Sequence, residues 1–544
     1  MFAQVYGLAI NGLQAHLIRV EVDVSNGLPD FSIVGLPNTA VREARERVRS
    51  AIKNSGFDFP LQRITVNLAP ADLKKDGSGL DLPIAIGILA ATGQCSTPSL
   101  DQLVFVGELS LEGQLRPVPG ILAMAVSLAK DSKYNLIVPP ENLSEAKLIE
   151  EIKCGASPYL SELVAAINQM PHSADSSLSP SHSNLDFHDN PLFSASNIEN
   201  SISVHTGFSI NSITNNSTFL QQPNSSSDFI DISTIKGQLQ AKRALEIAAA
   251  GGHNIILVGP PGSGKTLLAK AYAGILPPLT RSESLEVTKI YSIAGLLGHN
   301  GHLITNRPFR QPHHSATAVG ILGGGRDLKP GELILANHGV LFLDELPEFS
   351  RDVLESLRQP LEDRELTITR QRGSVRYPAR LSIVASMNPC PCGWYGDGNR
   401  PCTCTPRQIH NYRNRISGPL LDRFDLHIEV PRVEFEELHD ISPGESSATV
   451  QKRVLKAREI QWTRLGESRT NAEMSAQETA QHCSLDPLGQ ELLRRTFKQL
   501  NLSARSHDRI LRLSRTIADL EGEKDIEPRH LAEALQYRAL DPAT

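Results

Sequence analysis

A glycine-rich loop near the middle of the chain has the residue types that bind a nucleoside triphosphate. Asn254–Val258 is a short apolar run of strand length, and Leu267–Ala273 has the pattern of a helix. The loop between them, Gly259-Pro-Pro-Gly-Ser-Gly-Lys-Thr266, can turn its backbone N–H groups around a β-phosphate at the start of that helix. Lys265 is predicted to contact the β- and γ-phosphates of ATP, and Thr266 to bind Mg²⁺. The predicted nucleotide-binding residues are Gly259, Pro260, Pro261, Gly262, Ser263, Gly264, Lys265 and Thr266.

Two further apolar runs end in polar side chains that suit ATP hydrolysis. Gly339–Glu345 delivers Asp344, which is predicted to join the Mg²⁺ shell, and Glu345, which can polarise the attacking water. Leu381–Asn388 ends in an amide that fits a sensor of the γ-phosphate. The alternatives are an acidic pair that ends an ordinary strand and an Asn that caps a turn.

These motifs resemble those of the AAA+ superfamily, and the resemblance gives two arginines candidate roles. The segment 418–425 is similar to the loop that presents an arginine finger to the ATP of a neighbouring subunit, with Arg423 at the matching place. Arg415 is a second candidate, and a surface salt bridge is the alternative. An arginine supplied by a neighbour implies a ring.

The second arginine role is that of a sensor in the C-terminal region. The segment 503–509 resembles the second sensor motif of AAA+ proteins, with Arg505 at the matching place. Arg509 and Arg512 follow one and two helical turns later and remain alternatives. The guanidinium suits both roles because it is permanently charged and binds phosphate oxygens in pairs.

Residues 364–380 have β-branched side chains on both sides of a turn at 371–373, which predicts a β-hairpin. Five arginines against Glu365 give the segment a net charge of +4. In a ring such hairpins would present a positive collar to nucleic-acid phosphates. Arg370, Arg372 and Arg376 are the predicted DNA contacts. A solvated hairpin and a subunit contact are the alternatives.

Four cysteines lie within fifteen residues as two C-x-C pairs, Cys390 with Cys392 and Cys402 with Cys404. Four thiolates suit a closed, structural zinc site. His410 is a possible substitute ligand, and an iron–sulfur cluster or a metal-free loop are alternatives. This spacing favours a metal site in a reducing compartment over a disulfide framework, so the cytoplasm is the expected location.

Composition divides the chain into regions. A length of 544 residues is too great for one hydrophobic core. Residues 1–170 show strand-like runs at 3–10, 16–24 and 31–35 and an amphipathic helical pattern at 41–55; residues 171–227 are rich in Ser and Asn and predict a flexible linker. Apolar strands alternate with helices over 228–435, which is typical of a doubly wound parallel sheet, and 436–544 has helical periodicity and predicts a lid.

Net charge and hydropathy exclude some classes of protein. The net charge is -6, so a nucleic-acid site must be local rather than a whole basic surface. The longest apolar run, 82–91, is about half of a membrane span and predicts a buried helix. The first residues lack the basic segment of a signal peptide, so neither export nor membrane insertion is expected.

Four longer motifs narrow the resemblance to the magnesium-chelatase-like ATPases of the YifB/ComM type: 235–246, 307–314, 330–336 and 387–393. The similarity covers nearly the whole chain except the linker. It implies an α/β AAA+ core with a helical lid. It also implies a homo-oligomer, a hexamer, that works as a DNA helicase. Such proteins drive branch migration on single-stranded or branched DNA when transforming DNA is integrated, with recombination proteins as possible partners.

Residues 1–170 resemble the fold of the Lon-protease catalytic domain. A peptidase of that type needs a nucleophilic serine and an activating lysine. Gly79 stands at the serine position and Met124 at the lysine position. Peptidase activity is therefore not expected, and the region is predicted to bind DNA or a partner.

Two other functions share part of this pattern. A chelatase-type motor that remodels a protein partner would use the same nucleotide motifs without needing the hairpin and the cysteine loop. A non-enzymatic DNA clamp would not need the complete ATPase site. DNA-stimulated ATP hydrolysis separates the helicase from the chelatase.

Overall fold

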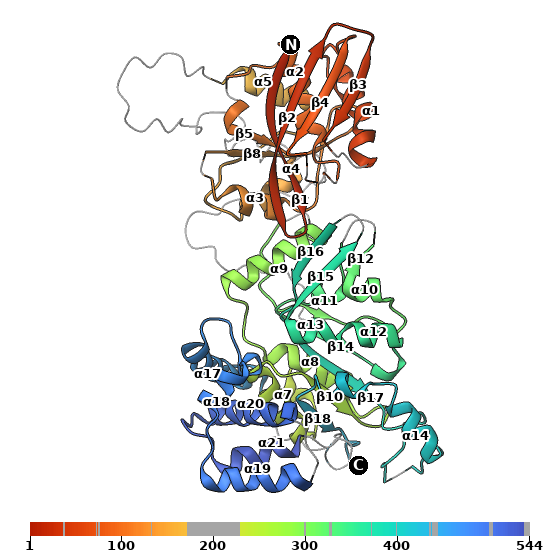
Figure 1. The fold of residues 1–544 in the computed structure, drawn as a ribbon, viewed down its shortest axis with the longest axis vertical. Helices are drawn as coiled ribbons and strands as arrows, with labels where there is room; N and C mark the ends of the chain where they lie inside the picture. Colours follow the sequence, from red (N-terminus) through yellow and green to blue (C-terminus); the bar gives the residue numbers. More distant parts are fainter. Residues whose placement is uncertain are drawn as a thin grey trace, which may run out of the picture. The chain divides into compact units, whose positions relative to one another are not determined.

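The computed structural model divides the chain into two compact units (Figure 1). Unit 1 comprises Met1–Phe219 and Leu285–Ile304, and unit 2 comprises Leu220–Ser284 and Thr305–Thr544. The predicted linker, 171–227, lies outside the described residues. The described residues are 1–35, 39–71, 73, 75, 77–98, 100–131, 133–170, 229–298, 301–325, 329–370, 373–398, 400–434, 437, 444–499 and 504–537.

Unit 1 is built on a seven-stranded mixed sheet with the order β3-β4-β2-β1-β5-β8-β9. β1 and β2 pair antiparallel, from Phe2 opposite Asp23 to Asn11 opposite Gln14, whereas β1 and β5 pair in parallel. The strands predicted at 3–10, 16–24 and 31–35 are confirmed. The strand bounds are β1 Phe2–Asn11, β2 Gln14–Ser25, β3 Asp30–Val34, β4 Arg63–Ala69, β5 Leu103–Phe105, β8 Asn135–Val138 and β9 Cys154–Ala156, with β6 Glu108–Leu109 and β7 Leu115–Arg116 as a separate ribbon.

The helices of unit 1 follow the sequence pattern. α1 (Thr39–Asn54) buries Val41 and Val48 on one side while Glu43, Arg45, Glu46 and Arg49 are exposed, as in an amphipathic helix. α2 (Asp81–Ala91) is buried at every residue, which confirms the buried helix predicted at 82–91. The remaining helices are α3 Ile121–Leu128, α4 Pro140–Ala146 and α5 Leu160–Asn168.

One segment from the middle of the chain belongs to unit 1 although the sequence places it within 228–435. This segment, 285–304, contains most of α9 (Arg281–Ala294). The backbone N–H of Gly120 donates to the Ser292 carbonyl at 3.1 Å. The Ser292 hydroxyl donates to Glu145, whose Oε1 also accepts from the backbone N–H of Leu122 at 2.8 Å. The carboxylate of Glu145 therefore joins the start of α3 to α9.

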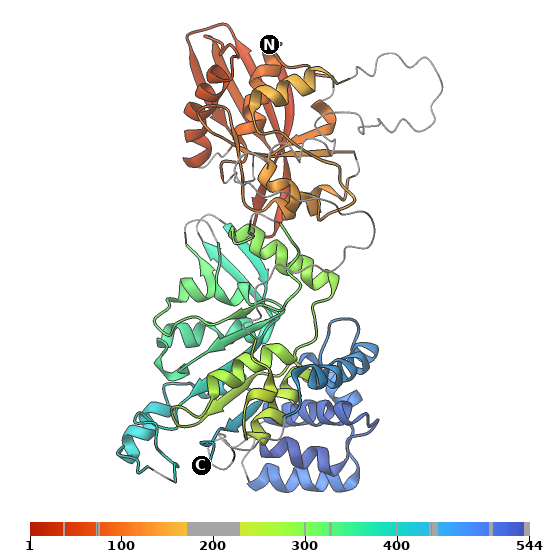
Figure 2. The ribbon, with the colours of Figure 1, turned by 180° about the vertical axis from the view of Figure 1, so that it is seen from behind.

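Unit 2 contains a five-stranded sheet with the order β11-β14-β17-β10-β18, in which every neighbouring pair is parallel. Parallel neighbours that are not consecutive require crossover helices, and Figures 1 and 2 show helices on both sides of the sheet. The predicted doubly wound parallel sheet is confirmed. Its strands are β11 Phe309–Arg310, β14 Val340–Leu343, β17 Ser382–Met387, β10 Ile255–Val258 and β18 Leu426–Glu429.

One face of this sheet packs on α7 (Leu239–Gly251) and α8 (Lys265–Ile275) in a core that is continuous with the C-terminal helices. Alternate strand residues such as Ile255 and Leu257 contribute to this core. Full burial of an aliphatic side chain of this size contributes about 1.5–3 kcal/mol. Smaller elements of the unit are α10 Ala318–Leu322, β12 Gly323–Gly324, β13 Lys329–Pro330, α11 Glu332–Leu335, α12 Arg351–Ser356, α13 Arg358–Asp363, α14 Pro406–Arg413 and α15 Gly418–Leu421.

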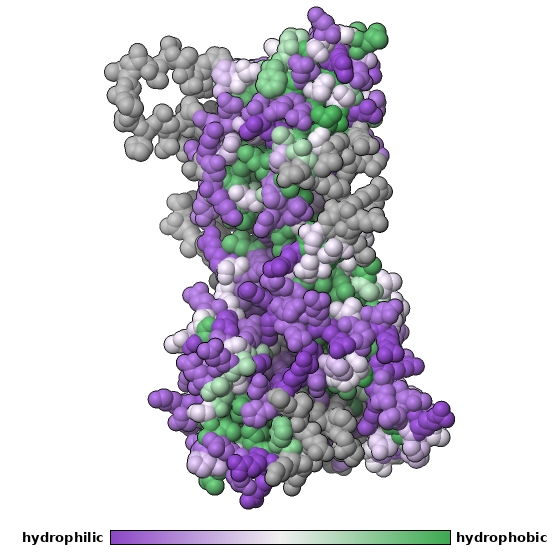
Figure 3. All heavy atoms as spheres, viewed as in Figure 1, coloured by the Kyte–Doolittle hydropathy of each residue, from purple (hydrophilic) through white to green (hydrophobic). Residues whose placement is uncertain are grey.

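The C-terminal region is helical, as predicted for a lid. Its described residues form α17 (Ser447–Leu465), α18 (Ala476–His482), α19 (Pro487–Gln499), α20 (Ala504–Glu521) and α21 (Pro528–Gln536). Figure 3 shows apolar side chains gathered over these helices. Among the described helices, none has the length and apolar character that crossing a membrane requires.

Candidate nucleotide and metal sites

The carboxyl ends of three neighbouring strands bring the predicted ATPase residues to one edge of the unit 2 sheet. β10 leads into the loop at 259–266, β14 leads to Asp344 and Glu345, and β17 leads to Asn388. Because the strands are parallel, these residues emerge at the same edge, where open α/β sheets bind ligands. We call this the carboxyl edge. The strand order therefore assembles the site from segments that are far apart in the sequence.

The glycine loop has the backbone conformation that its composition predicts. Gly262 and Gly264 have φ of +79° and +91°, in the left-handed region that favours glycine. A Cβ on Gly259 would lie 2.2 Å from the carbonyl oxygen of Val430, so no side chain fits there. α8 begins at Lys265, and the N–H groups of its first turn lie at the loop, as phosphate binding requires.

Lys265 lies between the glycine loop and Asn388, which follows β17. Its Nζ donates to the carbonyl oxygens of Gly259 and Pro260 at 2.8 Å each and to Asn388 Oδ1 at 3.4 Å. Burial lowers the pKa of Lys265 to about 8, against the opposing effect of Asp344 and Glu345. The ammonium is thus held at the place where a γ-phosphate and its sensor would meet.

Asp344 is positioned to share a metal ion with Thr266. Asp344 Oδ2 accepts a hydrogen bond from Thr266 Oγ1 at 3.4 Å, and Oδ1 accepts one from Ser386 Oγ. A hydroxyl and a carboxylate at this distance are hard oxygen ligands of the kind that Mg²⁺ binds. Ser386 was not anticipated from the sequence. The signal for it was a hydroxyl near the carboxyl end of a largely apolar strand.

Glu345 has the exposed carboxylate that a water-activating group needs. Its side chain is 54% exposed, and its Oε2 lies 3.5 Å from His314 Nδ1. Its backbone is left-handed, with φ of +55°, and its N–H donates to Ser386 Oγ at 3.2 Å. Left-handed non-glycine residues are concentrated at functional sites. His314 was also missed, although it ends the quoted motif 307–314.

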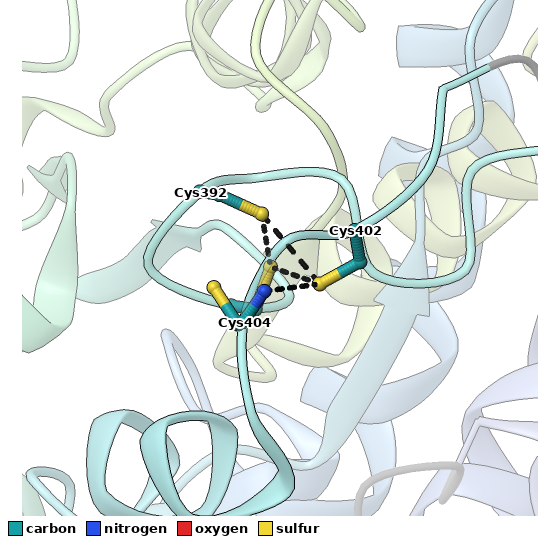
Figure 4. A group of neighbouring side chains, drawn as sticks. Cys392, Cys402 and Cys404 are labelled. Carbon is teal, nitrogen blue, oxygen red and sulfur yellow. Dashed lines mark hydrogen bonds between the residues drawn. The ribbon is translucent and has the colours of Figure 1, made fainter.

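The four cysteines of the predicted zinc site are close together. Their Sγ atoms all lie within 4.8 Å of one another, and Figure 4 shows the thiols of Cys392 and Cys402 directed toward each other beside Cys404. The Cys390–Cys392, Cys390–Cys402 and Cys392–Cys402 sulfur distances are 3.3, 3.7 and 3.6 Å. Ligands at the Zn–S distance in a tetrahedron are roughly 3.8 Å apart. These residues therefore fit a tetrahedral metal ion.

The thiols of the loop do not share one protonation tendency. A hydrogen bond from the backbone of Trp394 lowers the pKa of Cys392, whereas burial and the neighbouring thiols raise the pKa values of Cys402 and Cys404. His410 Nε2 hydrogen-bonds Asn414 Nδ2 at 2.8 Å. Among the described side chains, the ligand group comprises the four cysteines without His410.

The cysteine loop packs directly on the phosphate loop. Gly393, which has φ of +84°, lies so close that an added Cβ would be 2.7 Å from Pro261 Cδ. The Trp394 ring lies between two guanidinium groups, 4.6 Å from Arg400 and 4.4 Å from Arg432. Arg432 follows β18, so the cysteine loop is attached to the same edge of the sheet as the nucleotide loop.

Comparisons with known proteins identify the family. The model "Magnesium chelatase, subunit ChlI" matches residues 231–438, "Subunit ChlI of Mg-chelatase" matches 20–142, and "Magnesium chelatase, subunit ChlI C-terminal" matches 444–538. Competence protein ComM of Haemophilus influenzae is 45% identical over 540 residues, which cover 99% of this chain and 97% of ComM. The chain belongs to the YifB/ComM family of magnesium-chelatase-like proteins.

More distant relatives mark the limits of the likeness. The uncharacterized protein YifB of Escherichia coli is 43% identical over 539 residues, 99% of this chain and 97% of YifB. The magnesium-chelatase 38 kDa subunit of Rhodobacter capsulatus is 26% identical over 216 residues, 36% of this chain and 55% of that subunit. The similarity to the YifB/ComM proteins therefore extends over nearly the whole chain, whereas that to the chelatase subunit covers about a third of it.

The structure places the two arginine-finger candidates of this YifB/ComM family member differently. The Arg423 side chain is only 9% exposed and pairs with Glu362. Arg415 is 53% exposed, and its Nη1 lies 2.9 Å from Glu348 Oε2, close along the chain to Glu345. Arg415 is thus the more accessible of the two to a neighbouring subunit.

The lid arginines lie along α20. Arg505 is exposed near the start of the helix, and Arg512 Nε donates to Thr479 Oγ1 at 3.1 Å. Arg509 Nε lies 3.6 Å from Asp425 Oδ1, and Asp425 immediately precedes β18. The contact of Arg509 is therefore at the amino edge of the sheet, opposite Lys265.

The predicted β-hairpin is confirmed as β15 (Glu365–Arg370) and β16 (Gly373–Pro378). Arg376 is 72% exposed and lies 3.3 Å from Glu365 Oε2. Arg372 and the side chain of Arg370 lie outside the described residues. The exposed charge of Arg376 is on the hairpin face opposite the buried Val375 and Tyr377.

In unit 1 the two positions compared with Lon are both apolar. A Cβ on Gly79 would lie 3.4 Å from Val106 Cγ1, and Met124 is buried. The neighbouring Ser78 hydroxyl donates to Glu108, a carboxylate that cannot serve as the lysine of a serine–lysine pair. That unit 1 lacks peptidase activity stays a prediction.

Proposed function

We propose that the protein is an ATP-dependent DNA translocase that works as a ring. The main observation in support of this proposal is that β17 connects the end of the basic hairpin with the nucleotide loop. β16 of the basic hairpin ends at Pro378, β17 begins at Ser382, and β17 leads directly to Asn388 at the nucleotide loop. A change at the γ-phosphate position can therefore reach the hairpin along a single strand.

A second strand ties the hairpin to the hydrolysis site. The backbone N–H of Arg380, just after the hairpin, donates to Asn337 Oδ1 at 2.9 Å, and the His338 N–H donates to the Arg380 carbonyl at 2.6 Å. Asn337 and His338 precede β14, which ends beside Asp344 and Glu345. Both strands that carry catalytic side chains at one end thus hold the hairpin at the other.

The residues at the carboxyl edge have separate roles in hydrolysis. ATP bound with Mg²⁺ supplies the phosphoryl group that is transferred to water. Lys265 holds the β- and γ-phosphates, and Thr266 and Asp344 hold the metal ion. Glu345 takes up the proton of the attacking water, while Asn388 orients it. Arg423 or Arg415 acts as the finger toward the neighbouring subunit's ATP, and Arg505 as the second sensor.

The substrate class follows from the hairpin's charge. Arg370, Arg372 and Arg376 bind the phosphate backbone, whose contacts carry no sequence information. Similarity to a competence protein supports a role in natural transformation. There the ring, a hexamer, promotes branch migration on single-stranded or branched DNA, beside recombination proteins. Four clustered cysteines, which bind zinc, suit the reducing cytoplasm.

A chelatase-type motor is the second candidate, because the family models carry the chelatase name. Such a motor would remodel a protein partner with the same nucleotide site. In that function the hairpin arginines would not bind DNA. DNA should therefore stimulate the ATPase of a translocase but not that of a chelatase-type motor.

The test is DNA affinity over a salt series, measured together with DNA-stimulated ATPase, for the parent and for the Arg370→Ala/Arg372→Ala/Arg376→Ala variant. We expect weaker binding on unrelated sequences and a salt slope flatter by about one for each lost phosphate contact. DNA stimulation should fall while basal ATPase stays. The control Arg494→Ala/Arg495→Ala/Arg529→Ala removes the same charge from exposed lid positions. Equal effects of both triple variants, or none of either, would contradict the proposal.

A further inference from the structure

A polar cavity of about 50 Å³ lies in unit 2 at the amino edge of the sheet, where its strands begin. Gly339 before β14 and Ser382 of β17 line one side, and Thr470 and Glu473 of the lid region line another. A strand of four residues such as β10 separates the two edges of the sheet by about 13 Å. This cavity is therefore distinct from the site around Lys265.

Four arginines and two glutamates give the cavity a positive charge. Arg307 Nη2 lies 3.1 Å from Glu283 Oε2, and Arg364 Nη1 lies 2.9 Å from Glu473 Oε1. The two carboxylates are thus each matched by one guanidinium. Although burial acts to raise it, the pKa of Glu283 is lowered to about 2 by the hydrogen bond with His338 and the charge of Arg307, so it carries its negative charge at neutral pH. The charges that remain are those of the other two arginines, Arg380 and Arg458.

Arg458 has no carboxylate partner among the described residues. It is only 7% exposed, and its Nε and Nη2 both donate to one acceptor, the carbonyl oxygen of Ala249, at 3.0 and 2.7 Å. No hydrogen bond of its Nη1 is found within the described part of the chain. Burial, and next the charge of Arg307, lower its pKa to about 10, so the guanidinium is still charged at neutral pH. Glu283 and Glu473 stabilise this charge only from beyond ion-pair distance, and a buried charge without a directly paired counter-charge is costly.

Arg380 lines the same cavity with a second guanidinium. Its backbone is fixed by Asn337 and His338, but its exposed side chain makes neither a hydrogen bond nor an ion pair within the described residues. Guanidinium groups bind oxyanions through paired N–H donors. Two such groups lining one small cavity therefore favour an anion with several oxygen atoms.

We propose that this cavity binds one oxyanion of the phosphate or sulfate class, held by Arg458 and Arg380. The volume of the cavity limits the size of the anion. About 10–15 Å³ of such space holds one water molecule, so 50 Å³ accommodates a small polyatomic anion. Sites for nucleotide-sized ligands are roughly 300–1,000 Å³. The anion neutralises the excess charge and joins the strand starts, beside the hairpin, to the lid.

The oxyanion has two possible sources, a free inorganic anion or a phosphate group of bound DNA. Arg380 directly follows the hairpin, so a strand held there would lie near it. Both sources present the same chemistry to the arginines. The experiment therefore has one arm for each source.

The test uses the Lys265→Ala background, in which the nucleotide loop has lost its main phosphate contact. The melting temperature is measured against sodium phosphate, with sodium chloride at equal ionic strength as the reference. We expect phosphate at ten or more times its Kd to raise the melting temperature by roughly 2–5 °C. Arg458→Gln in that background should remove most of this shift. Arg494→Gln, which removes an exposed lid arginine paired with Glu491 away from the cavity, should keep it.

A second variant keeps the test decisive if Arg458→Gln folds poorly. Arg380→Gln changes an exposed side chain and should also reduce the phosphate shift. The other arm uses a short single-stranded oligonucleotide. A shift that requires the oligonucleotide and is lost in Arg380→Gln assigns the anion to DNA, whereas a shift with inorganic phosphate alone assigns it to a free ion. Equal shifts in parent and both variants, or no shift with either ligand, would overturn the proposal.

Discussion

The two edges of the unit 2 sheet differ in how the sequence builds them. At the carboxyl edge, contiguous motifs follow β10, β14 and β17, and each has its own pattern of glycine, acid or amide. At the amino edge, the charged residues come from separate segments, such as Arg307, Arg380 and Arg458, without a shared motif. The first edge is organised by backbone geometry and the second by side-chain charge.

This difference indicates a division of labour. The carboxyl edge holds the groups that we propose for hydrolysis, with the cysteine loop packed against Pro261. The amino edge holds the hairpin through Asn337 and the lid through the ion pair of Arg364 with Glu473. The strands between them are short and fully buried, so they connect the two edges directly. Changes at the carboxyl edge should affect chemistry, and changes at the amino edge should affect coupling.

The largest expected effect is at the carboxyl edge. Lys265→Ala should abolish nucleotide binding, because the loop loses its only lysine at the phosphates. Glu345→Gln should keep ATP and lower kcat by about 10²–10⁴, since a positioned base contributes that much. Nucleotide binding by fluorescence and turnover by phosphate release measure the two effects. Turnover of Glu345→Gln at the parent rate would show that another group activates the water.

The next largest expected effect is a pH dependence of ATP affinity, which arises at the carboxyl edge alone. The buried amine of Lys265 has a pKa of about 8, lowered from 10.5. Below pH 8 it is already protonated, so ATP affinity should be flat. Above pH 8 binding must take up a proton, and affinity should fall by about tenfold per pH unit toward the usual pKa. Lys265→Arg stays charged and should show no such fall. A steep fall in both proteins would place the titrating group elsewhere.

The cysteine loop should have a smaller effect on the same edge. The parent should contain about one zinc per chain, and Cys390→Ala or Cys402→Ala should lose it. Because Gly393 packs on Pro261, loss of the metal should also weaken ATP binding, by about tenfold, or roughly 1.4 kcal/mol. Elemental content and nucleotide affinity are the readouts, with Cys154→Ala as the control outside the cluster. Iron, or no metal in freshly reduced parent, would refute the zinc assignment.

The smallest effects should separate the two finger candidates. Arg423→Ala should lower the free energy of unfolding by about 1–3 kcal/mol, because its nearly buried side chain pairs with Glu362. Arg415→Ala should leave stability nearly unchanged. Replacing the arginine that acts as the finger should slow ATP hydrolysis, while ring formation and ATP binding persist. Mixing that variant with Lys265→Ala chains should restore some turnover. No recovery in demonstrably mixed rings would indicate action within one chain.

The contrast between the edges also explains what the sequence could predict. The strand–loop–helix order around Lys265, the hairpin and the cysteine quartet were predictable because each is local and has a periodic or spaced pattern. Ser386 and His314 were missed because their roles depend on strand pairing and on contacts with Asp344 and Glu345. The amino-edge cavity could not be predicted, although Arg307 begins the motif 307–314 and Arg364 and Arg380 belong to the basic hairpin segment. Arg307 and Arg380 both hydrogen-bond the backbone of His338, and Arg458 joins them only when α17 packs on the sheet.

The central claim, that hydrolysis at one edge moves DNA at the other, is tested by ATP-driven branch migration of a synthetic junction. Parent protein should resolve the junction only with hydrolysable ATP, and Glu345→Gln should bind it without resolving it. The triple hairpin variant should lose more branch migration than DNA affinity, because the hairpin both holds and displaces the strand, while basal ATPase remains. Branch migration by the triple variant at the parent rate, with ATP hydrolysed as before, would contradict the account and transfer the DNA contact to unit 1 or the cysteine loop.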